Sequence, residues 1–112
     1  MGLREAILAG DVEAFKAALA PEVVWVGVLP GQLCRNREDV TAILDQAQSS
    51  RTFSPEIVAH DEGRIVVDPH LDPPPDLFPH VHQVLVVEDE RIVEMRDYPN
   101  REAALAALET PW

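Results

Sequence analysis

Apolar residues near the N-terminus recur at the spacing of a helix face. They form two groups, Leu3, Ile7 and Leu8 followed by Val12, Phe15 and Leu19. Gly10 and Asp11 separate the groups, and glycine is typical of a helix end whereas aspartate is typical of a helix start. The pattern predicts two short helices, or one bent helix, that end before Pro21.

The apolar positions that follow have the composition of a strand rather than of a helix. β-Branched and aromatic residues dominate segment 23–28 (VVWVGV), which predicts a strand. A loop follows, and Asn36 is then placed to cap a helix. The spacing predicts a buried stripe on that helix, formed by Val40, Ile43, Leu44 and Ala47.

The second half of the chain alternates between apolar and polar positions. This alternation predicts strands over 52–60, 64–68, 80–88 and 91–97. Turns at 61–63 and 89–90 would join them as hairpins, and Asn100 would cap a last helix. Helices, a strand, a helix and then consecutive strands are the order of an α+β fold with an antiparallel sheet.

Length and charge narrow the functional classes. A chain of 112 residues predicts a single domain, residues 1–112. The net charge of −11 argues against a nucleic-acid partner and against anionic membrane surfaces, and no apolar run approaches the roughly 20 residues of a membrane span. One cysteine, Cys34, excludes an internal disulfide and fits a reducing compartment. Acidic residues interrupt the apolar N-terminus, unlike a signal peptide, so we expect a cytoplasmic protein.

Residues 68–79 are rich in proline and aspartate. The run DPPPD favours a stiff polyproline II conformation, which neither pairs with strands nor forms a helix. We expect a solvent-facing connector between two strands, more mobile than the strands themselves. The alternatives are a lid or a partner-binding segment, because Leu71, Leu77 and Phe78 are apolar.

Histidine and cysteine are the residue types of this chain that are candidates for metal binding or nucleophilic chemistry. His80 and His82 would share one face of a strand and present two imidazoles to a metal, which gives a metal site as one hypothesis. The nearby acidic residues have no diagnostic ligand spacing, so structural or cavity-lining histidines are the preferred interpretation. Cys34 lies beside a helix start with no histidine near it in sequence, and we expect it to be structural.

Three stretches of the chain, taken in order, resemble a known family. DVEAFKAALAPEVVWVGV, CRNREDVTAIL and DERIVEMRDYPNREAALAAL are similar to the SnoaL-like branch of the nuclear transport factor 2-like superfamily. The resemblance covers nearly the whole chain except about residues 51–79. It implies a cystatin-like cone, in which a curved antiparallel sheet wraps around the N-terminal helices and leaves a pocket at one end. Members of this superfamily commonly dimerise through the sheet.

The same resemblance suggests which residues carry function. Where ketosteroid isomerase has its general-base aspartate, its tyrosine donor and its protonated aspartic acid, this chain has Gly27, Leu3 and His82. Two of the three polar groups are missing, so steroid isomerisation is not expected. The acid/base aspartate of the polyketide cyclases corresponds to Asp97.

Strand alternation then predicts the two faces of the sheet. We expect Asp97 and His82 as catalytic candidates inside a pocket lined by Trp25, Gly27, Val84, Val86, Val93, Met95 and Tyr98. The outward positions would be Val81, Gln83, Leu85 and Val87, an apolar stripe that predicts a homodimer through the outer sheet face. In the alternative, the proline segment covers this stripe within one chain.

Three functions stay open from the sequence. The first is a protein that binds a small hydrophobic molecule in its cone, with no cofactor. The second is an enzyme of the cyclase, isomerase, dehydratase or hydrolase type, with Asp97 as acid/base and His82 beside it. The third is a metal-dependent site on His80 and His82.

Overall fold

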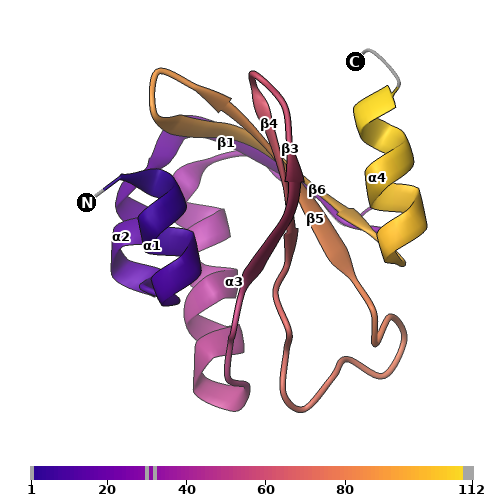
Figure 1. Ribbon diagram of the computed structural model, residues 1–112. Helices are drawn as coiled ribbons and strands as arrows, with labels where there is room; N and C mark the ends of the chain where they lie inside the picture. The colour runs from indigo at the N-terminus through magenta and orange to yellow at the C-terminus, as the bar shows by residue number, and fades with distance from the viewer. Residues whose placement is uncertain (1, 30, 32, 110–112) are drawn as a thin grey trace.

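A curved sheet of six strands separates three helices on one side from a single helix on the other (Figure 1). The computed structural model describes residues 2–29, 31 and 33–109. The elements in chain order are α1 (Leu3–Ala9), α2 (Val12–Ala17), β1 (Leu19–Val26), β2 (Leu33–Cys34), α3 (Arg37–Ser50), β3 (Glu56–His60), β4 (Arg64–Asp68), β5 (His82–Glu88), β6 (Arg91–Tyr98) and α4 (Arg101–Glu109). Among them, no helix is long and apolar enough to cross a membrane.

The predicted helix boundaries follow from side-chain caps. Gly10 ends α1 with φ of 67°, a left-handed conformation that glycine adopts without strain. Asp11 begins α2, and its Oδ1 accepts a hydrogen bond from the Ala14 amide at 3.0 Å. Asn36 and Asn100 begin α3 and α4 in the same way. All four boundary predictions are confirmed.

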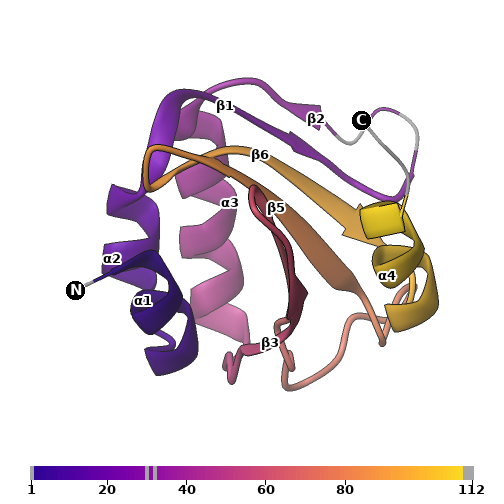
Figure 2. The same cartoon turned by 45° about the horizontal axis from the view of Figure 1, so that its top comes forward.

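The sheet has the strand order β2-β1-β6-β5-β4-β3, and β1, β6 and β5 lie side by side (Figure 2). Strands β3 to β6 pair antiparallel, as predicted. The turn between β5 and β6 consists of Asp89 and Glu90 with φ of 51° and 64°, as two-residue hairpin turns require. One pairing differs from the prediction, because β1 runs parallel to β6.

Several strand boundaries also differ from the prediction, and β5 begins at His82 rather than at residue 80. β1 begins at Leu19, before Pro21, because Leu19 and Ala20 are buried and Leu19 pairs with Ile92 of β6. Residues 33–34 form a short strand where a loop was expected. β3 begins at Glu56 rather than at residue 52, and Thr52 makes only an isolated bridge to Asp72.

Both faces of the sheet are covered, because alternate residues of one strand pack on opposite sides. Ile65 and Val67 of β4 belong to the core on the side of α1, α2 and α3. Val66, between them, packs with Val84 and Ala104 on the side of α4. Figure 1 shows α4 alone on that side of the sheet.

This arrangement corrects the predicted outer face. Leu85 is only 1% exposed and belongs to the core beneath α1 and α3, so the apolar stripe of β5 lies inside the fold. The opposite face, which carries Val84, is covered by α4. The apolar stripe from which we predicted a dimer interface is therefore part of the core. The homodimer stays a prediction, but this stripe is not its interface.

Candidate functional site

A cavity of about 300 Å³ lies between the N-terminal helices, the sheet and the proline-rich segment. The sheet contributes Trp25, Val67, Gln83, Leu85 and Asp97 to its lining. The other walls come from α1, α2, α3, residues 53–55 and the segment from Pro69 to Val81. Most of these residues are apolar, so the few polar side chains in the lining determine the chemistry of the cavity.

Three neighbouring strands bring three of those side chains together. Asp97 lies near the end of β6, and its Oδ1 accepts a hydrogen bond from Trp25 Nε1 at 2.9 Å. The same oxygen accepts a second bond from Gln83 Nε2 at 3.1 Å. Trp25 comes from β1 and Gln83 from β5, the strands on either side of β6. The prediction that Trp25 and Asp97 share one face is confirmed.

The second carboxylate oxygen of Asp97 faces the cavity without a partner. No hydrogen bond reaches Oδ2 from the part of the chain that the structure describes. No buried side-chain oxygen there lacks a partner, so Oδ2 is accessible, and Asp97 lines the cavity. Because Oδ1 already accepts two hydrogen bonds, a proton bound to Asp97 sits on Oδ2, where a ligand can reach it.

The pKa of Asp97 is raised above its usual value. Burial in the apolar cavity is the main cause, because it disfavours the charged carboxylate. The hydrogen bonds from Trp25 and Gln83 oppose this effect, since both stabilise the charged form. Asp97 thus combines a fixed orientation, one free oxygen and an environment that favours protonation, which are the requirements of a general acid or base.

The predicted position of His82 is wrong, and a β-bulge is the reason. At the turn, Val87 pairs with Ile92, but further along the hairpin Val86 pairs with Glu94. One extra residue in β6 therefore shifts the register, so that Gln83 rather than His82 lies opposite Asp97. A regular hairpin would have placed His82 there.

His82 instead lies on the α4 side of the sheet. Its ring is 4% exposed, and Nδ1 lies 2.7 Å from the carbonyl oxygen of His80. Because a carbonyl only accepts, Nδ1 carries the hydrogen, and Nε2 accepts from Arg101 Nε at 3.4 Å. Asp68 Oδ2 lies 3.5 Å from the same nitrogen. These contacts connect the buried His82 of the sheet to the exposed Arg101 at the start of α4.

The remaining predicted lining residues divide between the two faces. Val84, Val86 and Tyr98 follow His82 to the α4 side, and their placement in the cavity is wrong for the same reason. Met95 lies on the cavity side but is fully buried in the core. Gly27 and Val93 are half-buried, and neither lines the cavity, whereas Val28 does.

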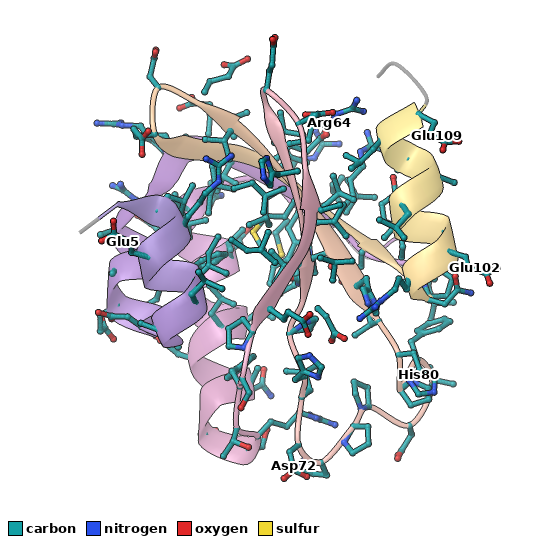
Figure 3. All side chains as sticks on the ribbon, in the orientation of Figure 1. Glu5, Arg64, Asp72, His80, Glu102 and Glu109 are labelled. Carbon is teal, nitrogen blue, oxygen red and sulfur yellow. The ribbon has the colours of Figure 1, made fainter. Side chains whose placement is uncertain are left out.

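The metal hypothesis finds no support in the described residues. They contain no group of three or more His, Cys, Asp or Glu side chains that could hold a metal ion. His80 is exposed in the loop before β5 (Figure 3), so it does not share a strand with His82. Cys34 is buried, and burial raises the pKa of its thiol, as expected for a structural cysteine.

The proline-rich segment forms a wall of the cavity and is not only a solvent-facing connector. Pro69, Leu71, Pro75, Phe78 and Val81 line the cavity. Hydrogen bonds between the backbones of Thr52 and Asp72, at 2.9 and 3.1 Å, attach the segment to the chain after α3. Leu71 and Phe78 were predicted as possible lid residues. Gln83 was predicted to face outward, and this is wrong, because its pairing with Asp97 depends on the bulge.

Several solved structures share this fold. A protein from Mesorhizobium loti named as a SnoaL-like polyketide cyclase superposes with a TM-score of 0.63 and 14% identity, over 86% of this chain and 92% of that chain. A nuclear transport factor 2-like protein of unknown function from Cytophaga hutchinsonii gives 0.61 and 13%, over 86% and 91%. An LEH-like epoxide hydrolase from M. tuberculosis gives 0.59 and 21%, over 99% and 92%. These similarities confirm the α+β cone.

A comparison with curated proteins gives no match. The family assignment rests on the sequence itself, because residues 2–95 match the family model of the SnoaL-like domain. This match spans most of the 112 residues and includes the strands that carry Trp25 and Gln83. The chain therefore belongs to the SnoaL-like domain family.

Proposed function

We propose that this protein binds a small, mainly apolar molecule in the cavity between the sheet and the N-terminal helices, with Asp97 contacting its polar group. The observation that carries the proposal is the Asp97 carboxylate, held in a fixed orientation inside a mainly apolar cavity of about 300 Å³. Such a volume lies at the lower end of the roughly 300–1,000 Å³ of small-molecule sites. Burial of the apolar part of the ligand drives binding, and Asp97 sets its orientation.

The proposal is tested by filling the cavity. Ala47 of α3 lines the cavity, whereas Ala42 of the same helix is exposed. Ala47→Phe should therefore abolish uptake of an apolar fluorescent probe, and Ala42→Phe should leave uptake unchanged. Extraction of the purified protein followed by mass spectrometry should find a small molecule in wild type and in Ala42→Phe, but not in Ala47→Phe. Equal probe uptake by both variants would contradict the proposal.

The second candidate function is proton transfer by Asp97. It is favoured by the raised pKa of this carboxyl group and by the free Oδ2 that faces the cavity. In the ionised form, Oδ2 removes a proton from a carbon or hydroxyl group of the ligand. It then returns that proton to another atom of the same molecule. Trp25 and Gln83 hold Oδ1 during both steps, and His82 takes no part because it lies on the other face.

Exchange of a ligand hydrogen for solvent deuterium distinguishes a protein that transfers protons from one that only binds the ligand. If Asp97 transfers protons, a bound carbon acid should exchange its hydrogen for deuterium in heavy water, and Asp97→Asn should stop the exchange while the ligand still binds. If the bound ligand exchanges its hydrogen only at the rate of the free ligand, Asp97 does not transfer protons and the proposed function is binding only.

We also propose that the protein is cytoplasmic and that it forms a homodimer. The single cysteine, which fits a reducing compartment, supports the cytoplasm. Light scattering at micromolar concentration should report twice the chain mass of 12.4 kDa. A stable monomer would exclude the dimer without affecting the cavity.

A further inference from the structure

Aromatic side chains are concentrated around the cavity. The sequence contains three phenylalanines, and all three, Phe15, Phe53 and Phe78, line it. Together with Trp25 they come from α2, from the segment before β3, from the proline-rich segment and from β1. Aromatic faces carry partial negative charge and attract cations, in particular ammonium groups.

Asp97 has no cationic partner of its own in the described residues. Its two hydrogen-bond donors, Trp25 and Gln83, are neutral, and no ion pair reaches it from that part of the chain. Arg96, the adjacent residue, extends on the other face of the sheet and pairs with Glu94 at 3.1 Å. The hydrogen bonds from these two neutral donors offset the cost of burying the carboxylate only in part, because the pKa of Asp97 is still raised.

When the other charged residues of the lining are included, the net charge of the cavity lining is still negative. Arg51 donates from Nε to the Pro73 carbonyl at 2.9 Å, which holds it at the proline-rich wall. Asp11 caps α2 and adds a second carboxylate to the lining. The net charge of −11 further raises the local concentration of cations at the protein. An anionic ligand would meet repulsion, and a neutral one would leave Asp97 uncompensated.

We propose that the cavity binds a small lipophilic amine in its ammonium form, with an N–H group donating to Asp97 Oδ2 and the hydrocarbon part lying among Phe15, Trp25, Phe53 and Phe78. This inference rests on the proposed binding function and adds the chemical class of the ligand. A charge-assisted hydrogen bond in an apolar cavity is stronger than a neutral one. The aromatic walls contribute to binding of both the cation and its apolar body.

Three probes with one carbon skeleton test the inference. Phenylbutylamine, phenylbutanol and phenylbutyrate differ only in a cationic, neutral or anionic head group. Their binding is measured near neutral pH by calorimetry. We expect the amine to bind about tenfold more tightly than the alcohol, as a charge-assisted bond to a buried carboxylate predicts, and the carboxylate probe to bind most weakly.

Two variants show whether Asp97 is the cause. Asp97→Asn keeps the shape of the side chain and removes its charge, so amine and alcohol should then bind within about threefold of each other. Asp76→Asn makes the same change at an exposed carboxylate of the proline-rich segment that does not line the cavity, and it should keep the wild-type preference. Phe78→Leu should weaken the amine about two- to fivefold more than the alcohol. This comparison tests the inference even if Asp97→Asn does not fold.

The outcomes separate the two proposals. If none of the three probes binds, the proposed binding function fails. If the alcohol binds wild type as tightly as the amine, or the amine preference survives Asp97→Asn, the cavity still binds small molecules but the inferred ligand class is wrong. If phenylbutyrate binds best, a cation in the lining dominates and the inference is also wrong.

Discussion

The indole of Trp25 donates a hydrogen bond of 2.9 Å from Nε1 to Oδ1 of Asp97, although the two residues are 72 positions apart in the sequence. The bond crosses from β1 to β6, the one parallel pairing in the described sheet. It holds the carboxylate in one orientation and leaves the other oxygen for a ligand. The carboxyl group of Asp97 is therefore positioned by the fold before any ligand binds.

Trp25→Phe and Gln83→Leu should each raise the pKa of Asp97 further. Both native side chains donate to Oδ1 and stabilise the charged form, and the bond from Trp25 has the larger effect. Trp25→Phe should therefore cause the larger rise. The pKa is measured from the carboxyl carbon shift of Asp97 during an NMR titration. A fall in the pKa of Asp97 in either variant would contradict the assigned hydrogen bonds.

Asp97→Asn should stabilise the fold at neutral pH. Because the folded-state pKa of Asp97 lies above its unfolded value, the folded state binds the proton more tightly. Stability is thus lost as the pH rises above the unfolded pKa, and the loss is complete above the folded-state pKa. Asparagine retains an oxygen for Trp25 and Gln83 and carries no charge. We expect a gain of about 1 kcal/mol in the free energy of unfolding near pH 7, within the range of single stabilising substitutions.

The pH dependence is the check on this explanation. The difference between Asp97→Asn and wild type should shrink in acid, where Asp97 itself is protonated. Urea unfolding at several pH values measures it. A constant difference across the pH range would assign the effect to packing rather than to the charge.

The sequence predicted the elements and the Trp25–Asp97 side of the cavity, because caps and alternation are local signals. The face of β5 was not predictable in the same way. Helices cover both faces of the sheet, so the stripes through Val84 and Leu85 are both apolar and alternation does not say which faces the cavity. The register was decided by one extra residue near Val93, and a bulge has no clear signature in this stretch.

Leu85→Ala should destabilise the protein by about 2–4 kcal/mol, because it removes buried apolar contacts and enlarges the cavity that Leu85 lines. Leu85 is 1% exposed and lies among residues of α1, α3 and the sheet. Ile43→Ala on α3 is the control. Ile43 was predicted to lie in the buried stripe of this helix, but it is 42% exposed, so its truncation should cost about 1 kcal/mol or less. Chemical denaturation measures both. A stable Leu85→Ala monomer would instead assign Leu85 to a subunit interface.

Arg64→Leu should loosen the C-terminal half of α4. The guanidinium donates to the carbonyl oxygens of Ala107 and Leu108 at 2.9 Å each, which satisfies acceptors that the helix end leaves without partners. Figure 3 shows Arg64 beside this end of the helix. Amide hydrogen exchange in α4 should become faster, whereas Arg91→Leu, at an exposed position, should not change it. Unchanged exchange in Arg64→Leu would show that packing alone holds α4.

Replacing Pro74 and Pro75 with glycine should preserve the fold and speed the exchange of ligand. The backbone bonds between Thr52 and Asp72 attach the segment independently of these two prolines. Pro75 and Phe78 line the cavity, so a more flexible chain at this point opens a wall of the cavity rather than the core. The greater freedom of glycine in the unfolded chain should cost about 0.4–1 kcal/mol at each position. Stopped-flow measurements with the amine probe should show faster association and dissociation at a similar affinity, and loss of the folded state would show that the prolines are required for folding.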